Sequence, residues 1–130
     1  MILLDTNTLI FYLKGREPVV KRLQAASPRD IAIPSVVAYE IEYGTRKSGS
    51  AQRRAIVSNL LSGLREAPFD HSAAAEAARI RVELEARGLT IGPIDLMIAG
   101  TAISNSAALA THNTREFSRV KGLRLEDWTR

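Results

Sequence analysis

The sequence contains no cysteine. Disulfide bridges, thiolate metal sites and a cysteine nucleophile are therefore excluded, and a reducing compartment, the cytoplasm, is the expected location. No stretch approaches the roughly 18 apolar residues of a membrane-spanning helix, and the first residues favour a strand rather than a signal peptide. We expect neither export nor a membrane partner.

The chain has a modest basic excess. Its 18 Lys and Arg side chains outnumber 14 Asp and Glu, which gives a net charge of +4 over 130 residues. Of the basic residues 14 are arginine, the better bidentate phosphate ligand. This favours a polyanionic partner such as nucleic acid, although an arginine-rich genome produces the same bias without function. The length and the 45% hydrophobic content fit one domain spanning residues 1–130.

Strand-like and helix-like patterns alternate along the chain. The connections are long enough for parallel pairing, so we expect an α/β fold with a central, mostly parallel, twisted sheet of four to five strands flanked by helices. The first strand is expected at the centre of the sheet. The predicted strands cover residues 1–4, 31–33, 67–70, 107–111 and 123–125, and the longer predicted helices cover 18–26, 36–44, 51–64, 71–86 and 96–103.

Local signals give further expectations about the helices. Thr6 or Asn7 is expected to cap the first helix, and Ser35 the helix after the second strand. Residues 71–86 place arginines and glutamates four apart, which is typical of surface ion pairs. In the helix that starts at Ser35, residues Val37, Ile41 and Gly44 mark the expected buried stripe, with Glu40 on its flank.

Three acidic residues occupy positions suited to chemistry. Asp5 ends the first strand, Glu40 lies early in the helix after the second, and Asp95 opens a nearly all-apolar helix. Each alone is explained more simply as a group that stabilises a helix N-terminus. Buried together without a neighbouring lysine, the three carboxylates would destabilise the fold, so a divalent cation is the expected partner. Ligation by oxygen alone favours Mg²⁺ or Mn²⁺ over Zn²⁺.

The chain resembles the PIN-domain ribonucleases, and more narrowly the VapC-type toxins of bacterial toxin–antitoxin pairs. The resemblance extends over essentially the whole chain, and four motifs in the right order and spacing carry it. These motifs are Leu4–Asn7, Ser35–Gly44, Gly92–Ala99 and Thr111–Phe117.

The resemblance implies a PIN-like fold whose acids, at the carboxyl edge of the sheet, bind Mg²⁺ or Mn²⁺. Asp5, Glu40 and Asp95 match the three principal acidic places. The fourth acidic place falls near Asn113, an amide, so either Glu116 completes the site through water or Asn113 contributes a neutral oxygen. The number of metal ions stays open.

Neighbouring polar groups have supporting roles in this interpretation. The side chains of Thr6, Asn7, Thr111 and Asn113 are expected to orient carboxylates or water, or to act only as caps and turn residues. Arginines that could follow an RNA backbone are Arg46, Arg53, Arg54 and Arg115. The interpretation needs no catalytic role for His71 or His112, and His112, which is next to the site in the sequence, is the alternative that stays open.

The expected activity is metal-assisted hydrolysis of an RNA phosphodiester, with Asp5, Glu40, Asp95 and Glu116 as the catalytic acids. The resemblance implies a 5′-phosphate product, a structured RNA substrate such as a tRNA anticodon loop, and inhibition of translation. It also implies an antitoxin whose C-terminal segment wraps the toxin, and a homodimer.

Other classes fit less well. A haloacid-dehalogenase-like phosphatase requires an acid where Asn7 stands, and a phosphoacceptor receiver requires a lysine after a late strand. The alternative that stays open is a catalytically impaired PIN-like module that binds RNA or an antitoxin, and Asn113 is the reason to consider it.

Overall fold

The computed structural model describes residues 1–130 and contains one five-stranded sheet in which every pairing is parallel. The strand order is β3-β2-β1-β4-β5, so the first strand is central, as predicted. The strands are β1 (Ile2–Leu4), β2 (Ile31–Pro34), β3 (Arg65–Ala67), β4 (Ala108–Ala110) and β5 (Leu125–Glu126). The predicted α/β class with a parallel sheet is confirmed.

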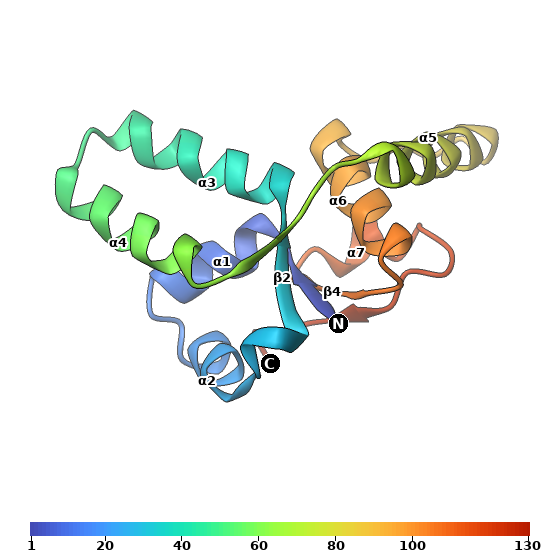
Figure 1. Ribbon diagram of the computed structural model, residues 1–130. Helices are drawn as coiled ribbons and strands as arrows, with labels where there is room; N and C mark the ends of the chain where they lie inside the picture. The colour runs from blue at the N-terminus through green and yellow to red at the C-terminus, as the bar shows by residue number, and fades with distance from the viewer.

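Helices cover both sides of the sheet (Figure 1). On one side lie α1 (Thr6–Leu13), α2 (Glu17–Ala25), α3 (Ser35–Ser48) and α4 (Ala51–Ser62), and a 3₁₀ turn, η1 (Pro28–Asp30), leads into β2. On the other side lie α5 (His71–Ala86), α6 (Pro93–Ser104) and α7 (Thr114–Phe117). With helices on both faces, the inner strands are apolar along their whole length, as in β2 and β4, where every residue is buried.

Small residues allow α5 and α6 to cross closely. A Cβ added at Gly100 of α6 would lie 2.6 Å from the Ala73 carbonyl oxygen and 2.7 Å from the Ala77 backbone nitrogen of α5. No side chain fits at that distance, so a residue without Cβ is required here. The alanine-rich face of α5 therefore serves backbone-to-backbone packing on α6.

Three strands match their predicted ranges to within one residue at each end, and two, β3 and β5, differ by more. The third strand ends at Ala67, because Pro68 has no N–H to donate to the ladder, and Asp70 instead caps α5 by accepting the Ala73 N–H at 3.0 Å. The last strand begins at Leu125 rather than Leu123, whose N–H is used in a turn to the Val120 carbonyl. It is an edge strand, as predicted.

Both predicted N-caps were wrong. Asp5 caps α1, whereas Thr6 and Asn7 are already inside the helix. Ser35 is the first residue of α3, and its hydroxyl donates to the Ala67 carbonyl at 3.3 Å. Gly44 is exposed, and the next residue, Thr45, takes the buried place in the stripe.

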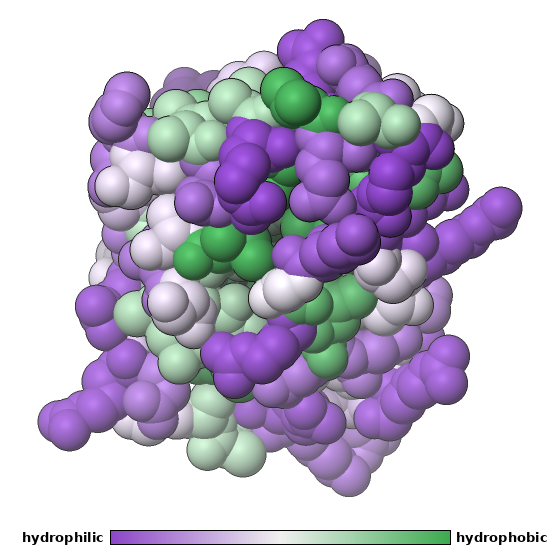
Figure 2. All heavy atoms as spheres, turned by 90° about the vertical axis from the view of Figure 1, so that its right-hand side faces the viewer, coloured by the Kyte–Doolittle hydropathy of each residue, from purple (hydrophilic) through white to green (hydrophobic).

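The predicted ion pairs on α5 are present. Arg79 and Arg87 both pair with Glu83, at 3.6 and 3.3 Å, and Arg81 pairs with Glu85 at 3.1 Å. Figure 2, which shows the side that carries these helices, has hydrophilic side chains over most of the face and separated apolar patches between them. None of the helices combines the length and the apolar character that crossing a membrane requires.

Candidate metal and active site

Asp5 sits where the central strand passes into α1. Its backbone is still extended, and its N–H donates to the Ala110 carbonyl at 3.1 Å, so the β1–β4 ladder continues through it. Its Oδ1 accepts the Thr8 N–H at 2.8 Å, and its Oδ2 accepts the hydroxyl of Thr111, which follows β4. The carboxylate is thus fixed between α1 and the end of β4, and Asp5 is 4% exposed.

Burial dominates the electrostatics of Asp5. Desolvation raises the pKa of its carboxyl above the usual value, although hydrogen bonds from Thr111 and Thr8 act in the opposite direction. The negative charge of Glu40 raises this pKa further. Asp5 is thus a buried acid whose charge lacks full compensation from the protein.

Glu40 approaches Asp5 from α3. Its half-buried carboxylate accepts a hydrogen bond from the Thr6 hydroxyl, which belongs to the first residue of α1. Glu42, two residues further along the same helix, instead pairs with Arg46 at 3.4 Å. The two acids of α3 therefore differ in role, and Glu40 alone is tied to the carboxyl edge of the sheet.

Asp95 completes the group from the other side of the sheet, in the first turn of α6. Burial, followed by the charges of Glu116, Asp5 and Glu40 in that order, raises the pKa of Asp95 to about 6. No hydrogen bond offsets these effects. The structure therefore brings together the four acids predicted from the sequence, here called the acidic site: Asp5, Glu40, Asp95 and Glu116.

Asn113 links two members of the acidic site. Its Nδ2 donates to Glu116 Oε2 at 3.3 Å, and its backbone N–H donates to Thr111 Oγ1 at 2.9 Å. The Thr111 hydroxyl donates onward to Asp5. Asn113 thus organises both the residue that fixes Asp5 and the acid that stands near the fourth place.

The acidic site suits a divalent cation by its chemistry. The ion pairs of the structure involve other acids, and none includes Asp5, Glu40, Asp95 or Glu116. The donors are carboxylate oxygens, the ligands that Mg²⁺ and Mn²⁺ prefer. In their present rotamers no three acidic or histidine side chains stand close enough to hold one ion. Ligation therefore requires side-chain movement, and the two least constrained carboxylates are Asp95, which accepts no hydrogen bond, and Glu40, which accepts one from the Thr6 hydroxyl.

Sequence reasoning missed one supporting residue, Thr8. Its N–H donates to Asp5 Oδ1, and its hydroxyl donates to the Ala110 carbonyl at 3.0 Å. Thr8 therefore joins α1 to β4 next to Asp5. The available signal was the spacing, because a helix-capping aspartate bonds the N–H three residues later. Of the other residues expected to support the site, Asn7 is exposed.

A groove opens beside Glu40, and one predicted RNA-contacting arginine lines it. It has a volume of about 290 Å³ and runs between α1, α3 and α4. Its walls are apolar at Ile10, Leu13 and Ile56, with Lys14 and Arg53 as the cations. Arg46 is held by Glu42, and Arg54 and Arg115 are exposed on α4 and α7.

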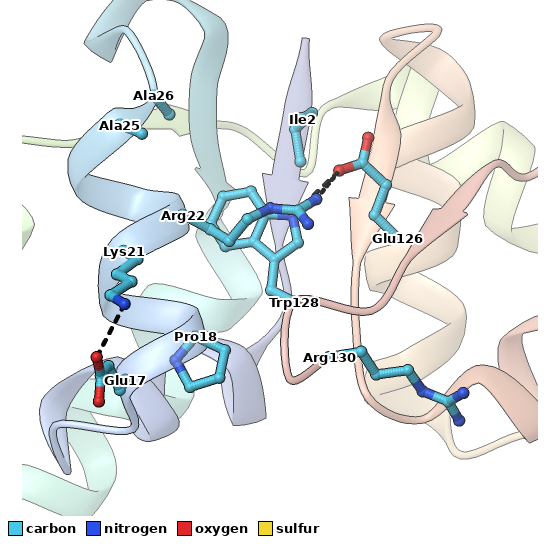
Figure 3. Close-up of a pocket in the computed structure, with 10 residues that line it drawn as sticks. All are labelled: Ile2, Glu17, Pro18, Lys21, Arg22, Ala25, Ala26, Glu126, Trp128 and Arg130. Carbon is cyan, nitrogen blue, oxygen red and sulfur yellow. Dashed lines mark hydrogen bonds and ion pairs between the residues drawn. The ribbon is translucent and has the colours of Figure 1, made fainter.

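A larger cavity of about 730 Å³, whose lining includes none of the four acids, lies between α2 and the C-terminal residues (Figure 3). Its lining includes Ile2, at the opposite end of β1 from Asp5. There Arg22 stacks on the Trp128 ring at 5.5 Å and pairs with Glu126 at 3.0 Å, as Figure 3 shows. These side chains satisfy one another and anchor the C-terminus on α2.

Comparison with known proteins decides the family. Residues 2–123 match the PIN domain. The chain belongs to the PIN-domain family. Within the PIN-domain family its relatives are VapC proteins: it is 38% identical to the tRNA(fMet)-specific endonuclease VapC of Salmonella typhimurium over 127 residues, which are 97% of this chain and 96% of that protein. Ribonuclease VapC2 of Rickettsia felis is 36% identical over 129 residues, with 97% and 96% covered.

Solved structures agree with this PIN-domain assignment. DNA-bound VapBC from Salmonella typhimurium superposes with a TM-score of 0.89 at 37% identity, covering 98% of this chain and 97% of that one. VapBC2 from Rickettsia felis, bound to a DNA fragment from its promoter, gives 0.87 at 35% identity, with 98% and 99% covered. The PIN-like fold expected from the sequence is confirmed.

Proposed function

We propose that this VapC-family PIN domain is a metal-dependent endoribonuclease, the toxin of a toxin–antitoxin pair, which acts on structured RNA in the cytoplasm and thereby inhibits translation. One observation carries the proposal: four acids from separate elements meet at the carboxyl edge of the sheet without a basic partner. In parallel α/β sheets that edge is the usual position of a ligand site.

Asp5, Asp95 and Glu40 are the proposed ligands of Mg²⁺ or Mn²⁺, and Glu116 completes the shell at greater distance. When bound, such a cation lowers the pKa of a water molecule and offsets charge in the phosphoryl transition state. The buried position of Asp5 supports a ligand role, because Thr8 and Thr111 leave each of its oxygens one lone pair.

The protein groups have separate tasks in hydrolysis. Glu40 or Asp95 accepts the proton of the attacking water and directs its oxygen at phosphorus. The bond from phosphorus to the 3′-oxygen then breaks, the 3′-oxygen takes up a proton, and a 5′-phosphate remains on the other fragment.

The proposed substrate is an RNA loop, and initiator tRNA is the first to test, because a relative 38% identical is named a tRNA(fMet)-specific endonuclease. Bases in an anticodon loop are unstacked and accessible, which suits an open edge of a sheet. Four arginines supply cations for phosphates: Arg53 lines the groove beside Glu40, Arg54 is on the same helix, Arg46 is on α3 and Arg115 is on α7.

The proposed partners are an antitoxin and a second copy of the chain. The related structures are VapBC toxin–antitoxin complexes. The groove beside Glu40, apolar with Lys14 and Arg53 on its wall, suits an amphipathic antitoxin segment that reaches the acidic site. A homodimer would cover Tyr39 and Tyr43, which are 61% and 58% exposed on α3.

The test is an RNA cleavage assay with the protein freed of antitoxin. Total RNA and initiator tRNA are incubated with Mn²⁺ or Mg²⁺, and fragments are mapped with their 5′ ends. We expect discrete cleavage that disappears with chelator and falls at least about a hundredfold in Asp5→Ala and Asp95→Ala. Glu40→Gln has a matched control in Glu42→Gln on the same helix, which should retain activity.

Two outcomes of this assay would contradict the proposal. RNA or antitoxin binding without cleavage, unchanged by Asp5→Ala, would replace the nuclease with the catalytically impaired module. Equal losses in Glu40→Gln and Glu42→Gln would show that damage to α3, rather than loss of an acid at the site, explains the defect.

A further inference from the structure

His112 lies between two residues that belong to the acidic site. Thr111, before it, donates to Asp5, and Asn113, after it, donates to Glu116. Its Cα is therefore about 3.8 Å from the Cα of each of them. His112 therefore stands at the carboxyl end of β4, at the same edge of the sheet as the acids, where a nucleic-acid strand bound at the acidic site would run.

The imidazole is held in one orientation by the residues after β5. Nδ1 lies 3.2 Å from Asp127 Oδ2 and 3.2 Å from Thr129 Oγ1. Asp127 is itself fixed, because its Oδ1 accepts the Thr129 hydroxyl at 2.6 Å and the Thr129 N–H at 3.0 Å. The ring also packs edge-on against Phe11 of α1, with centroids 5.9 Å apart.

These contacts determine which ring nitrogen carries the hydrogen. The Asp127 carboxylate can only accept, and Thr129 gives its hydroxyl hydrogen to Asp127, so the hydrogen must be on Nδ1 of His112. In the neutral ring Nε2 is then a bare acceptor. Both hydrogen bonds of the ring use Nδ1, and the side chain is 52% exposed, so Nε2 is left for a partner from outside.

We propose that His112 is a substrate-contacting residue whose Nε2 accepts a hydrogen bond from a ribose 2′-hydroxyl of the RNA close to the scissile phosphate, which makes the enzyme prefer RNA to DNA. The inference rests on the proposed ribonuclease function. It follows from the chemistry of the backbone: phosphate and ring oxygens only accept, and the 2′-hydroxyl is the one donor of an internal sugar–phosphate unit. A fixed acceptor beside the backbone therefore matches that group.

Nearby cations suit the same backbone. The Arg16 guanidinium lies 4.6 Å from the centroid of the Phe11 ring, which packs against His112. Arg130 Nε lies 3.5 Å from the Asp127 oxygen that fixes the imidazole, and its side chain is 84% exposed. Phosphates that flank the contacted ribose would find these two arginines on the surface around His112.

Two amide replacements separate contact with RNA from a purely structural role. In His112→Asn the amide nitrogen takes the place of Nδ1 and keeps the bond to Asp127, but nothing replaces Nε2. In His112→Gln an amide oxygen reaches the Nε2 position, while the bond to Asp127 is lost. The substrates are an initiator tRNA anticodon stem-loop of ribonucleotides only and the same RNA with single 2′-deoxy substitutions around the cleaved bond.

Single-turnover rates give the result. For the wild type, one deoxy position should slow cleavage about tenfold, the usual effect of one hydrogen bond. His112→Asn should be about tenfold slower on the all-ribose RNA and insensitive to that deoxy substitution, whereas His112→Gln should keep part of the rate and of the sensitivity. Thermal midpoints of the variants are measured alongside.

Results that overturn the inference about His112 differ from results that count against the ribonuclease function. The inference is overturned if His112→Asn cleaves like the wild type, or if it stays as sensitive to the deoxy substitution as the wild type. Failure of the wild type to cleave any RNA would count against the proposed function. Affinities for the same RNAs then decide about His112: a preference for the 2′-hydroxyl that His112→Asn abolishes supports the contact, and an unchanged preference refutes it.

Discussion

Replacing Asp95 by asparagine should stabilise the metal-free protein. The Asp95 carboxylate is half-buried, lies near three other acids and has no basic partner, so its ionised form opposes folding. An asparagine side chain would keep the size and a polar end while removing the charge. Most substitutions near a protein core destabilise, so an increase in stability would be a specific signature of the acidic site.

The magnitude follows from the pKa. Burial and the neighbouring acids raise the pKa of Asp95 from 3.8 to about 6. Roughly two pKa units correspond to about 3 kcal/mol, which solvent screening of a half-buried side chain reduces to about half. The charge also interacts favourably with the N-terminus of α6, by about 0.3–1 kcal/mol, and this is lost. The net gain is about 0.5–1 kcal/mol, or a rise of about 2–4 °C in the thermal midpoint.

The pH dependence has a definite sign. Because folding raises the pKa of Asp95, the cost of its charge is absent below about pH 4, grows between about pH 4 and 6, and is complete above that. Thermal unfolding with chelator at pH 7.5 and pH 4 should therefore show a gain for Asp95→Asn at the higher pH only. With millimolar Mg²⁺ the order should reverse, because the wild type gains binding energy that the variant has lost.

The matched control for Asp95→Asn is Glu17→Gln. Glu17→Gln changes an acid in the first turn of α2 that is exposed and paired with Lys21 at 2.9 Å, so it should lose a little stability. If Asp95→Asn loses several degrees at pH 7.5 without metal, Asp95 serves mainly to stabilise the helix N-terminus. The account of repelling acids would then be wrong.

Three further substitutions test the packing and the supports of the site. Gly100→Ala should cost about 2–3 kcal/mol in urea unfolding, because its Cβ would meet the α5 backbone at 2.6–2.8 Å; a neutral result would contradict the close crossing. Thr111→Val should lose about 1–3 kcal/mol and weaken Mn²⁺ binding, while Thr111→Ser retains both, and equal behaviour of the two would argue against the hydroxyl. Burial raises the pKa of Asp127, but hydrogen bonds from Thr129 and His112 outweigh it and lower it to about 2. Asp127→Asn should therefore be less stable at pH 7, with a difference that narrows as pH falls from about 4 toward 2; a constant difference would rule out this origin.

The convergence of the acids could be predicted from the sequence because it depends on topology. Asp5 directly follows an apolar strand, and Glu40 lies in the helix after the next one. In a parallel sheet the carboxyl ends of strands share one edge, so the two meet there without knowledge of side-chain positions. Asp95 does not directly follow a strand, so its position could be predicted only from the family motif and from the apolar character of α6.

The bounds of short strands, the helix cap and the groove could not be predicted from the sequence, because they depend on how the chain pairs and packs. Strands of two or three residues have too little periodicity to locate, which explains the shifted bounds of β3 and β5. The sequence predicts Asp5 in the site and Thr6 or Asn7 as the helix cap. In the structure the Asp5 carboxylate belongs to the acidic site and also caps α1 by accepting the Thr8 N–H. The groove beside Glu40 requires the packing of α4 on α3, and local patterns do not reveal it.

A Mn²⁺ titration followed by electron paramagnetic resonance tests the central claim, that Asp5, Glu40 and Asp95 together hold a divalent cation. It uses antitoxin-free wild type beside Asp5→Ala, Asp95→Asn, Glu40→Gln and the control Glu42→Gln. The account predicts at least one bound ion in the wild type and in Glu42→Gln, with affinity reduced at least about tenfold in each of the other three. Binding that is absent from the wild type, or unchanged by removal of Asp5 and Asp95, would contradict it.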